Sequence, residues 1–314
     1  MKTIFTVFTA TYNRSHTLYR VYESLAQQTF RDFEWLVVDD GSVDDTKDKV
    51  TRWAKEANFT IRYIHQENRG KHVAWNNGVR LARGRFFLSL DSDDSCVEDA
   101  LKVFLDTWDS IPEDKRSEFS GVCSLVMDET GRIMGTPFPK DIFDARSKEM
   151  RRKFHVKGEK WGFQRTDVLL EFPFPELAEG QYIPEYIVWN RISKKYKERF
   201  INRTLRTYYN PATSSSDQLT ASPVWKNSEA ILLGHICALN EQYEWFNYDP
   251  IFFIKAAINA SRVARHAKVS LLEQWRRIDK LHMQLLWLFG IAAGFLLYTR
   301  DIYRRNSGTG WHRK

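Results

Sequence analysis

The 314-residue chain has only three cysteines, and their positions predict neither a disulfide framework nor a metal site. Cys96, Cys123 and Cys237 are odd in number, widely separated, and lack metal-ligand spacing. A reducing compartment is therefore expected. The first residues enter an apolar run with no basic region or cleavage site before it, so we expect no signal peptide. Internal repeats and long low-complexity tracts are also missing.

Most of the chain carries almost no net charge. Residues 261–314 hold 11 Lys/Arg and 3 Asp/Glu, a local net charge of +8, whereas the whole chain carries +7, so the preceding 260 residues carry −1. A neutral body argues against a nucleic acid as partner. The basic C-terminal part suits contact with an anionic surface.

Strand-like and helix-like segments alternate through the first part of the chain. Apolar, β-rich runs at 3–10, 33–38, 60–65 and 86–90 are separated by helical patterns at 16–27, 43–57 and 71–82. This order predicts an α/β fold with a Rossmann-like, mostly parallel central sheet and helices on both faces.

The rest of the chain is less regular. We expect further strands at 120–127, 132–135 and 205–209, helices at 97–109 and 184–195, and a helical pattern from 224 onward. These patterns predict two domains, an α/β domain at 1–222 and a helical C-terminal extension at 223–314.

Polar clusters follow three of the predicted parallel strands, at 11–14, 39–42 and 91–94. In such sheets ligands bind beyond the carboxyl ends of the strands, so a shared site is expected there. The last cluster places Asp91, Asp93 and Asp94 directly after a buried run. Carboxylates this close raise one another's pKa, which favours a bound cation such as a hard divalent metal shared with substrate phosphates. A helix cap at Asp94 is the alternative.

These motifs resemble those of the family 2 glycosyltransferases, inverting enzymes of the hexosyltransferase type with the A-type glycosyltransferase fold. The resemblance is to members that build bacterial surface polysaccharides. It covers residues 3–100 densely and in the family's order, and it thins afterwards. The matching segments are Phe8 to Arg14, Gln28 to Phe30, Phe33 to Ser42, Glu67 to Gly70, Ala74 to Gly78, Ala82 to Gly84 and Leu90 to Asp94.

The resemblance implies a nucleotide-diphospho-sugar donor, and a UDP-sugar is the expected one. Tyr12 would stack on the base, and Asp39 or Asp40 would accept the imide N–H; an ordinary strand-end aromatic and a helix-capping turn are the alternatives. Asp93 would hold Mn²⁺ or Mg²⁺, with Asp94 as the alternative ligand. The predicted nucleotide-binding residues are Ala10, Tyr12, Arg14, Asp39, Asp40, Asn68, Arg69, Lys71, Asp91 and Ser92.

Two residues of the second half are implied on the acceptor side. Glu185 follows the helix-starting Pro184 and would be the general base. The alternative is that its charge only complements the helix dipole. Glu176 and Glu179 are reserve candidates for the base. Trp161, in a strand expected at 157–162, would stack on an acceptor sugar or pack in the core.

The segment at 281–299 has nineteen residues without Lys, Arg, Asp or Glu. As a helix it would be about 28 Å long, close to the roughly 30 Å of a bilayer's hydrocarbon core. Basic residues flank both ends, so the segment suits an interfacial helix or a single span; a buried core helix or an oligomer contact is the alternative. We expect this tail to bind the cytoplasmic face of a bacterial plasma membrane and the acceptor to be a lipid-linked or growing surface glycan.

Two other functions fit part of the pattern. A catalytically inactive protein that binds sugar nucleotides or glycans would keep the same motifs. A nucleotidyltransferase would share the nucleotide site and the acidic metal ligands. The chain has no glycine-rich, Arg-Lys activation loop after its first strand, which argues against the second alternative.

Overall fold

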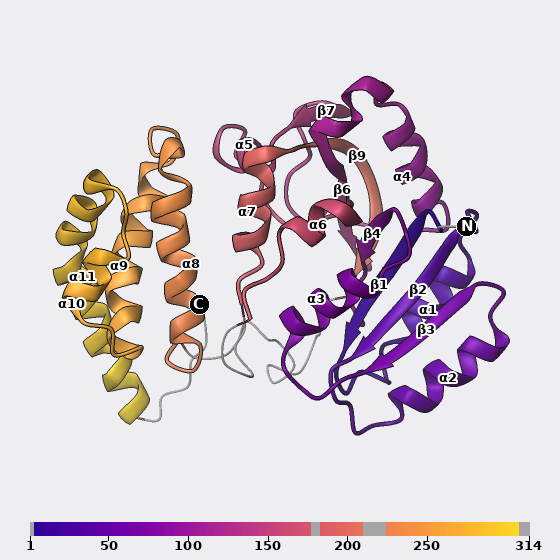
Figure 1. Ribbon diagram of the computed structural model, residues 1–314, viewed down its shortest axis with the longest axis horizontal. Coiled ribbons are helices and arrows are strands. Elements are labelled where there is room, and N and C mark those ends of the chain that lie inside the picture. Colours follow the sequence, from indigo (N-terminus) through magenta and orange to yellow (C-terminus); the bar gives the residue numbers. More distant parts are fainter. Residues whose placement is uncertain (1–2, 177–182, 210–223, 308–314) are drawn as a thin grey trace. The chain divides into compact units, whose positions relative to one another are not determined.

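The computed structural model describes residues 3–176, 183–209 and 224–307, which form two compact units (Figure 1). Unit 1 comprises residues 1–180 and 191–212, and unit 2 comprises 181–190 and 213–314. The division does not simply follow the chain, because 181–190 groups with the C-terminal helices. Each unit is described separately below.

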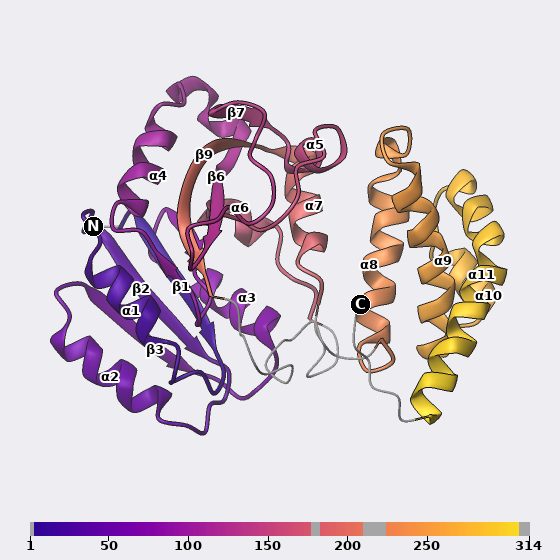
Figure 2. The same cartoon turned by 180° about the vertical axis from the view of Figure 1, so that it is seen from behind.

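Unit 1 is built on one mixed sheet whose described strands follow the order β3-β2-β1-β4-β8-β6-β9-β5, with β7 paired to β9. The first four strands by sequence pair in parallel, and β8 is antiparallel to both β4 and β6. Strands β6 and β9 lie side by side in both views (Figure 1 and Figure 2). The strands are β1 (Phe5–Thr11), β2 (Phe33–Asp39), β3 (Thr60–His65), β4 (Phe86–Ser89), β5 (Ser95–Cys96), β6 (Phe119–Asp128), β7 (Ile142–Ala145), β8 (Lys160–Arg165) and β9 (Lys197–Tyr208).

Helices cover both faces of this sheet, as the alternating pattern predicted. Phe5 and Val7 of β1 join the large core formed with α1, α2 and α4. Phe8, which points to the opposite face, packs against Trp75 of α3 with ring centroids 5.7 Å apart. The α-helices of this part are α1 (Tyr19–Ala26), α2 (Thr46–Glu56), α3 (Lys71–Leu81), α4 (Ala100–Asp109), α5 (Ser147–Arg152), α6 (Thr166–Glu171) and α7 (Tyr186–Lys195), of which α7 crosses between the units.

The register of the parallel strands brings the polar clusters to one edge. Thr11 lies opposite Asp39, and Asp39 lies opposite His65, at the carboxyl ends of three neighbouring strands. β4 pairs with β1 only as far as Ser89 opposite Phe8, so the following acidic residues continue beyond the sheet at the same edge. The predicted coincidence of the clusters is confirmed.

The middle of the chain differs from the prediction in several elements. The strand expected at 132–135 is wrong: the segment makes one isolated bridge, Met127 to Ile133, and Gly135 has a φ of 103°, outside the extended region. β9 begins at Lys197, eight residues before the strand expected at 205–209. α5 and α6 are six residues each, too short for a helical period to be recognised.

Unit 2 contains four described helices besides the start of α7: α8 (Ser228–Glu241), α9 (Pro250–His266), α10 (Leu271–Arg276) and α11 (Leu281–Asn306). The Asp249 side chain accepts a hydrogen bond from Phe252 N and caps α9, and Pro250 takes the first helical position. In the described part of the chain, α11 is the one helix whose length and composition would allow it to cross a membrane, and 22% of its most apolar window is buried.

Candidate functional site

The acidic loop is held against the end of β1 by hydrogen bonds on both sides of Leu90. Leu90 N donates to the Phe8 carbonyl at 2.9 Å, and Thr9 Oγ1 donates to the Leu90 carbonyl at 2.9 Å. The indole N–H of Trp35 in turn donates to Thr9 Oγ1 at 3.0 Å. Buried groups of two strands therefore help to set the position of the loop.

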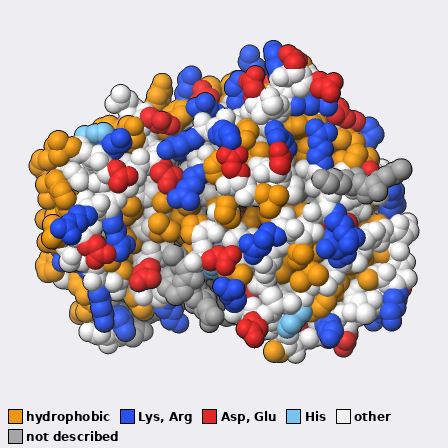
Figure 3. Space-filling view, in the orientation of Figure 1, with side chains coloured by type: hydrophobic (Ala, Val, Ile, Leu, Met, Phe, Trp, Pro, Cys, Tyr) orange, Lys and Arg blue, Asp and Glu red, His pale blue; other side chains and the backbone are white. Residues whose placement is uncertain are grey.

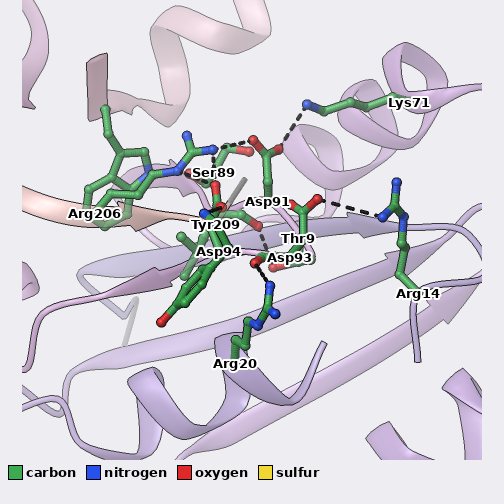
Figure 4. A network of polar contacts seen from close by, with 12 residues as sticks. Thr9, Arg14, Arg20, Lys71, Ser89, Asp91, Asp93, Asp94, Arg206 and Tyr209 are labelled. Atoms are coloured by element: carbon green, nitrogen blue, oxygen red, sulfur yellow. Dashed lines mark hydrogen bonds and ion pairs between the residues drawn. The ribbon is translucent and has the colours of Figure 1, made fainter. Parts of the chain in front are cut away.

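Two of the three carboxylates accept short hydrogen bonds from cationic side chains of the protein (Figure 4). Arg206, near the end of β9, places Nε 2.6 Å from Asp94 Oδ2 and Nη2 2.7 Å from Asp91 Oδ2. Lys71, the first residue of α3, donates to Asp91 Oδ1 at 3.0 Å. Asp94 has no exposed surface, and Tyr209 N also donates to it at 3.2 Å. The protein thus supplies much of the positive charge that these acids require.

The pKa values of Asp94 and Asp91 are shifted in opposite directions. Burial raises the pKa of Asp94 to about 6, and neighbouring Asp91 and Asp93 add to the effect while Arg206 opposes it. Burial also disfavours the charged form of Asp91, but Lys71 and Arg206 together hold the pKa of Asp91 well below its usual range. Asp91 therefore stays ionised at every pH relevant to function.

Asp93 is the partly exposed acid with the looser cationic pairing, since Asp91 is similarly exposed, at 34%, but is paired with both Lys71 and Arg206. Its side chain is 30% exposed, and its ion pair with Arg14 has a long N–O distance of 3.8 Å. The Asp93 carbonyl accepts a hydrogen bond from Arg20 at 2.9 Å, and the Arg20 guanidinium lies 4.2 Å from the centre of the Tyr209 ring. Between the two alternatives for a metal ligand, Asp93 fits better than Asp94, whose carboxylate is buried against Arg206.

The side chains of the loop suit a metal that the protein shares with a ligand. Within the described ranges, no group of three or more His, Cys, Asp and Glu is arranged to hold a metal ion. An accessible carboxylate at Asp93 can take part in coordination, and Mg²⁺ and similar hard cations are commonly held by one or two carboxylates together with substrate phosphates.

The second cluster connects the ends of β2 and β3. Asp40 accepts three hydrogen bonds, from Gln66 Nε2 at 2.7 Å, Arg69 N at 2.9 Å and Gly70 N at 2.8 Å. Asp39 accepts from Ser42 N at 2.8 Å and from the Tyr63 hydroxyl at 2.6 Å. Both predicted residues lie at the site edge. Asp40 shapes the loop before α3, while Asp39 keeps more of its acceptor capacity.

The first cluster is fastened to the second through Asn13. Its φ of 52° is left-handed, its N–H donates to Ser42 Oγ at 2.8 Å, and its Oδ1 accepts from Val43 N at 2.9 Å. The adjacent Tyr12 is 49% exposed, as a ring that stacks on a ligand must be. Ala10 lies opposite Val38 in the sheet, one residue before the cluster.

The turn before α3 leaves two predicted residues exposed, Asn68 and Arg69. Gly70 has a φ of 95°, a conformation that side-chain-bearing residues rarely adopt. Arg69 Nη2 lies 3.5 Å from Glu176 Oε2. Ser92 is half-buried in the acidic loop. With these, the structure brings all ten predicted nucleotide-binding residues to the same edge of unit 1.

The acceptor-side residues are placed differently. Trp161 is 4% exposed, packs on Phe104, and donates its indole N–H to the Ser89 carbonyl at 2.5 Å, so of its two possible roles the structure favours core packing. Glu185 precedes α7, where Val188 N and Trp189 N bond to its carbonyl, and it groups with unit 2.

The reserve candidates for the base differ as well. Glu176 accepts a hydrogen bond from Asn76 at 3.0 Å and pairs with Arg69 and Arg80. Glu179 lies outside the described residues.

Sequence reasoning missed Arg206, Arg20 and Tyr209. Arg206 lies 112 residues after Asp94, in a strand whose sequence carries no recognisable motif. Arg20 is one basic residue among many on an ordinary amphipathic helix. The pairing of β9 with β5 and β6, which requires the fold, brings Arg206 and Tyr209 to the acidic loop, and Arg20 reaches it from α1.

Comparison with known proteins gives a consistent result. The family model described as glycosyl transferase family 2 matches residues 6–115. A beta-1,3-glucosyltransferase of Campylobacter jejuni, named for GalNAc(5)-diNAcBac-PP-undecaprenol, is 27% identical over 236 residues, which cover 73% of this chain and 71% of that protein. Against three other curated relatives, at 32–37% identity, the chain spans only 15–43% of their length.

Two solved structures share the fold at low sequence identity. Staphylococcus aureus TarS 1–349, crystallised with UDP-GlcNAc, matches with a TM-score of 0.65 and 20% identity, covering 99% of this chain and 93% of that one. The mannosyltransferase PcManGT of Pyrobaculum calidifontis, in complex with GDP-Man and Mn²⁺, matches with a TM-score of 0.51 and 17% identity, covering 96% and 85%. These likenesses establish the A-type architecture.

Proposed function

Because the chain belongs to glycosyl transferase family 2, we propose that it is an inverting glycosyltransferase that uses a UDP-sugar. The observation that carries the proposal is the acidic loop after β4, where an accessible Asp93 lies among Arg14, Lys71 and Arg206. A nucleoside diphosphate is an anion that would contact cations and, through a metal, a carboxylate at the same place. Loops of this composition at the carboxyl edge of a parallel sheet suit such a ligand.

Separate residues would recognise the parts of the donor. The exposed Tyr12 ring would stack on the base, and Asp39 or Asp40, at the end of β2, would accept the imide N–H of uracil. Asp91, kept ionised by Lys71 and Arg206, would accept from ribose hydroxyls. Arg69 and the N-terminus of α3 would face the phosphates.

Mn²⁺ or Mg²⁺, held by Asp93 and by the donor diphosphate, would supply Lewis-acid assistance that makes the nucleoside diphosphate a better leaving group. The base for the acceptor hydroxyl would be Glu185, which stands at the start of α7. A carboxylate there fits the general-base role that inverting transfer demands. Glu176 is less suited, because its carboxylate is engaged by Asn76, Arg69 and Arg80.

The acceptor would be a lipid-linked or growing surface glycan at the cytoplasmic face of the plasma membrane. The name of the Campylobacter jejuni relative includes an undecaprenol-linked glycan. The apolar α11 and the basic residues around it support membrane attachment. The α/β unit would then act on the polar part of the acceptor.

A thermal-shift panel of UDP, GDP, dTDP and CMP, each with and without Mn²⁺, tests the donor site. Ligand linkage predicts stabilisation of about 2.7 kcal/mol at a hundredfold excess over the dissociation constant. We expect a metal-dependent shift with UDP that is lost in Asp93→Asn and kept in Asp109→Asn, a matched change of an exposed acid on α4. No shift with any nucleotide would refute the donor site. Pyrophosphate release from UTP and a sugar 1-phosphate, without UDP release from a UDP-sugar, would indicate nucleotidyl transfer.

A further inference from the structure

The outer face of α11 is apolar and exposed. The buried residues of this helix repeat at Met283, Trp287, Gly290, Gly294 and Asp301, which is the spacing of one helix face. The opposite face carries large apolar side chains with much of their surface exposed, Phe289 at 86% and Leu296 at 68% among them. The exposed large apolar residues of α11 are Leu281, Leu285, Leu288, Phe289, Phe295, Leu296 and Tyr303.

Basic side chains accompany this surface. Arg276, Arg277 and Lys280 lie exposed just before α11, and Arg300, Arg304 and Arg305 lie exposed in its last turns. Figure 3 shows hydrophobic side chains gathered along the side of unit 2 where α11 lies, with Lys and Arg beside them. An apolar face with cationic flanks is complementary to a bilayer surface that contains anionic lipid.

The inner face of α11 is fastened to α9 by close backbone packing. A Cβ on Gly290 would lie 3.1 Å from Ile258 N, and one on Gly294 would lie 2.7 Å from the Ile258 carbonyl oxygen. Small residues at such positions allow two helices to approach more closely than larger ones do. The two helices therefore form a closely packed pair with little room for rearrangement.

A buried ionic cluster fixes the same pair near the end of α11. Asp301, which has no exposed surface, accepts from Arg262 Nε at 2.6 Å and Nη2 at 2.7 Å, and His266 Nε2 lies 3.1 Å away. Separating α11 from α9 would leave a buried carboxylate without its partners, which is strongly unfavourable. Any membrane-bound state is therefore expected to keep α9 beside α11.

Helices α9 and α11 run parallel to each other, and this direction limits how they can bind a membrane. Gly290 lies at Ala257–Ile258, Gly294 at Ile258–Ser261, and Asp301 at Arg262 and His266, so both sequences advance in the same direction. The exposed Lys255 of α9 consequently lies beside the middle of the apolar stretch of α11. If α11 crossed the bilayer, Lys255 would be carried to the hydrocarbon centre.

We propose that unit 2 docks on anionic membranes with α11 lying in the plane of the interface, its outer face inserted among the lipids, and that α11 does not cross the bilayer. The proposal deepens the membrane location given under Proposed function. It does not depend on sugar transfer, since binding to vesicles is measured without donor or acceptor.

Flotation of the full chain with preformed vesicles tests the docking surface. We expect binding to vesicles of phosphatidylcholine with phosphatidylglycerol, weaker binding to phosphatidylcholine alone, and release by salt. Replacing both Phe289→Glu and Leu296→Glu should reduce the bound fraction by about tenfold or more, because two apolar anchors are lost. Leu170→Glu, a matched change of an exposed leucine on α6 in unit 1, should bind as the wild type does.

Maleimide labelling distinguishes the two membrane arrangements. The three native cysteines are buried, so Asp279→Cys before α11 and Ser307→Cys after it would report on its two ends. With the protein added to vesicles from outside, an impermeant maleimide should label both positions. Labelling of only one position would overturn the in-plane arrangement.

Two flotation results would overturn the docking proposal itself. One is equal binding of the double glutamate variant and Leu170→Glu. The other is absence of vesicle binding by the wild-type protein, combined with light scattering that shows a dimer for the wild type and a monomer for the double variant. A second copy of the chain would then cover this face. Either result would leave the nucleotide-binding tests of unit 1 unaffected.

Discussion

Removal of the Arg206 guanidinium should strongly destabilise unit 1, because Arg206 is the ion-pair partner of the buried Asp94. Arg206→Met keeps most of the aliphatic volume but leaves Asp94, which is fully buried, with a hydrogen bond from Tyr209 N in place of its ion pair. Breaking a buried ion pair by deleting one partner costs about 3–5 kcal/mol. We expect a loss of that size in the free energy of unfolding at pH 8, measured by urea denaturation.

The loss should depend on pH in a defined direction. Burial already raises the pKa of Asp94 from 3.8 to about 6 with Arg206 present, and removal of the guanidinium should raise it further. A carboxyl whose folded-state pKa is raised contributes stability below its unfolded pKa and loses it as pH rises through the folded value. Each additional unit of pKa corresponds to about 1.4 kcal/mol, so the deficit of Arg206→Met should shrink by about 1–2 kcal/mol between pH 8 and pH 5.5.

Arg203→Met is the matched control, because it makes the same chemical change on the same strand. Arg203 pairs with Asp99 at 3.4 Å, but its side chain is 59% exposed. Exposed ion pairs contribute about 0–1 kcal/mol. If Arg206→Met is no more destabilising than Arg203→Met, or if its deficit is the same at both pH values, the buried pair with Asp94 does not have the role assigned to it.

Three further changes test other parts of the protein. Tyr12→Ala should weaken UDP binding by about 1–3 kcal/mol, the usual contribution of one base–aromatic stack. Tyr19→Ala, which changes another exposed tyrosine, should leave UDP affinity unchanged, and titration calorimetry measures both affinities. Glu185→Gln should lower kcat by about 10²–10⁴-fold and leave UDP affinity unchanged, as expected for a general base. A preserved kcat in a steady-state assay of UDP release would refute the assignment. Asp301→Ala should destabilise unit 2 by about 3–5 kcal/mol at pH 7, because it leaves the largely buried Arg262 without its carboxylate partner. A loss no greater than that of the exposed Asp279→Ala, measured by urea denaturation, would contradict this.

The sequence was sufficient to predict the first half of unit 1 because that half is built from local patterns. Each parallel strand is an apolar run, each helix has an apolar period, and the carboxyl ends of parallel strands must meet at one edge. The observed β1 to β4 and α1 to α3 differ from the predicted ranges by a few residues at most. The nucleotide-binding candidates lie at or just beyond the ends of these strands, and the resemblance to the family supplied their roles.

The second half depends on contacts that no local pattern encodes. β9 is half-buried along much of its length and mixes arginine with apolar residues, so its sequence favours neither a strand of twelve residues nor a role in the site. Trp161 shows the same difficulty, because an isolated tryptophan has equal reason to bind a sugar or to pack on Phe104. Burial, which is a property of the whole fold, decided that case.

The charges around the acidic loop also determine how a metal should bind. Three carboxylates within four residues appeared to require an external cation, but Arg206 and Lys71 already neutralise Asp94 and Asp91. A metal would then find at Asp93 a partly exposed carboxylate whose ion pair with Arg14 is long. Such a site alone should hold Mn²⁺ weakly, since hard cations need several oxygen ligands.

The missing oxygens would come from the diphosphate of the donor, so the metal and the nucleotide should bind cooperatively. Coupling between two ligands is reciprocal: the factor by which UDP raises the affinity for Mn²⁺ must equal the factor by which Mn²⁺ raises the affinity for UDP. After correction for the Mn²⁺–UDP complex in solution, we expect this factor to be at least about fivefold, within the usual range of coupling energies. Calorimetric titration of each ligand with and without the other measures both factors, and tight Mn²⁺ binding without nucleotide would show that the protein supplies ligands beyond Asp93.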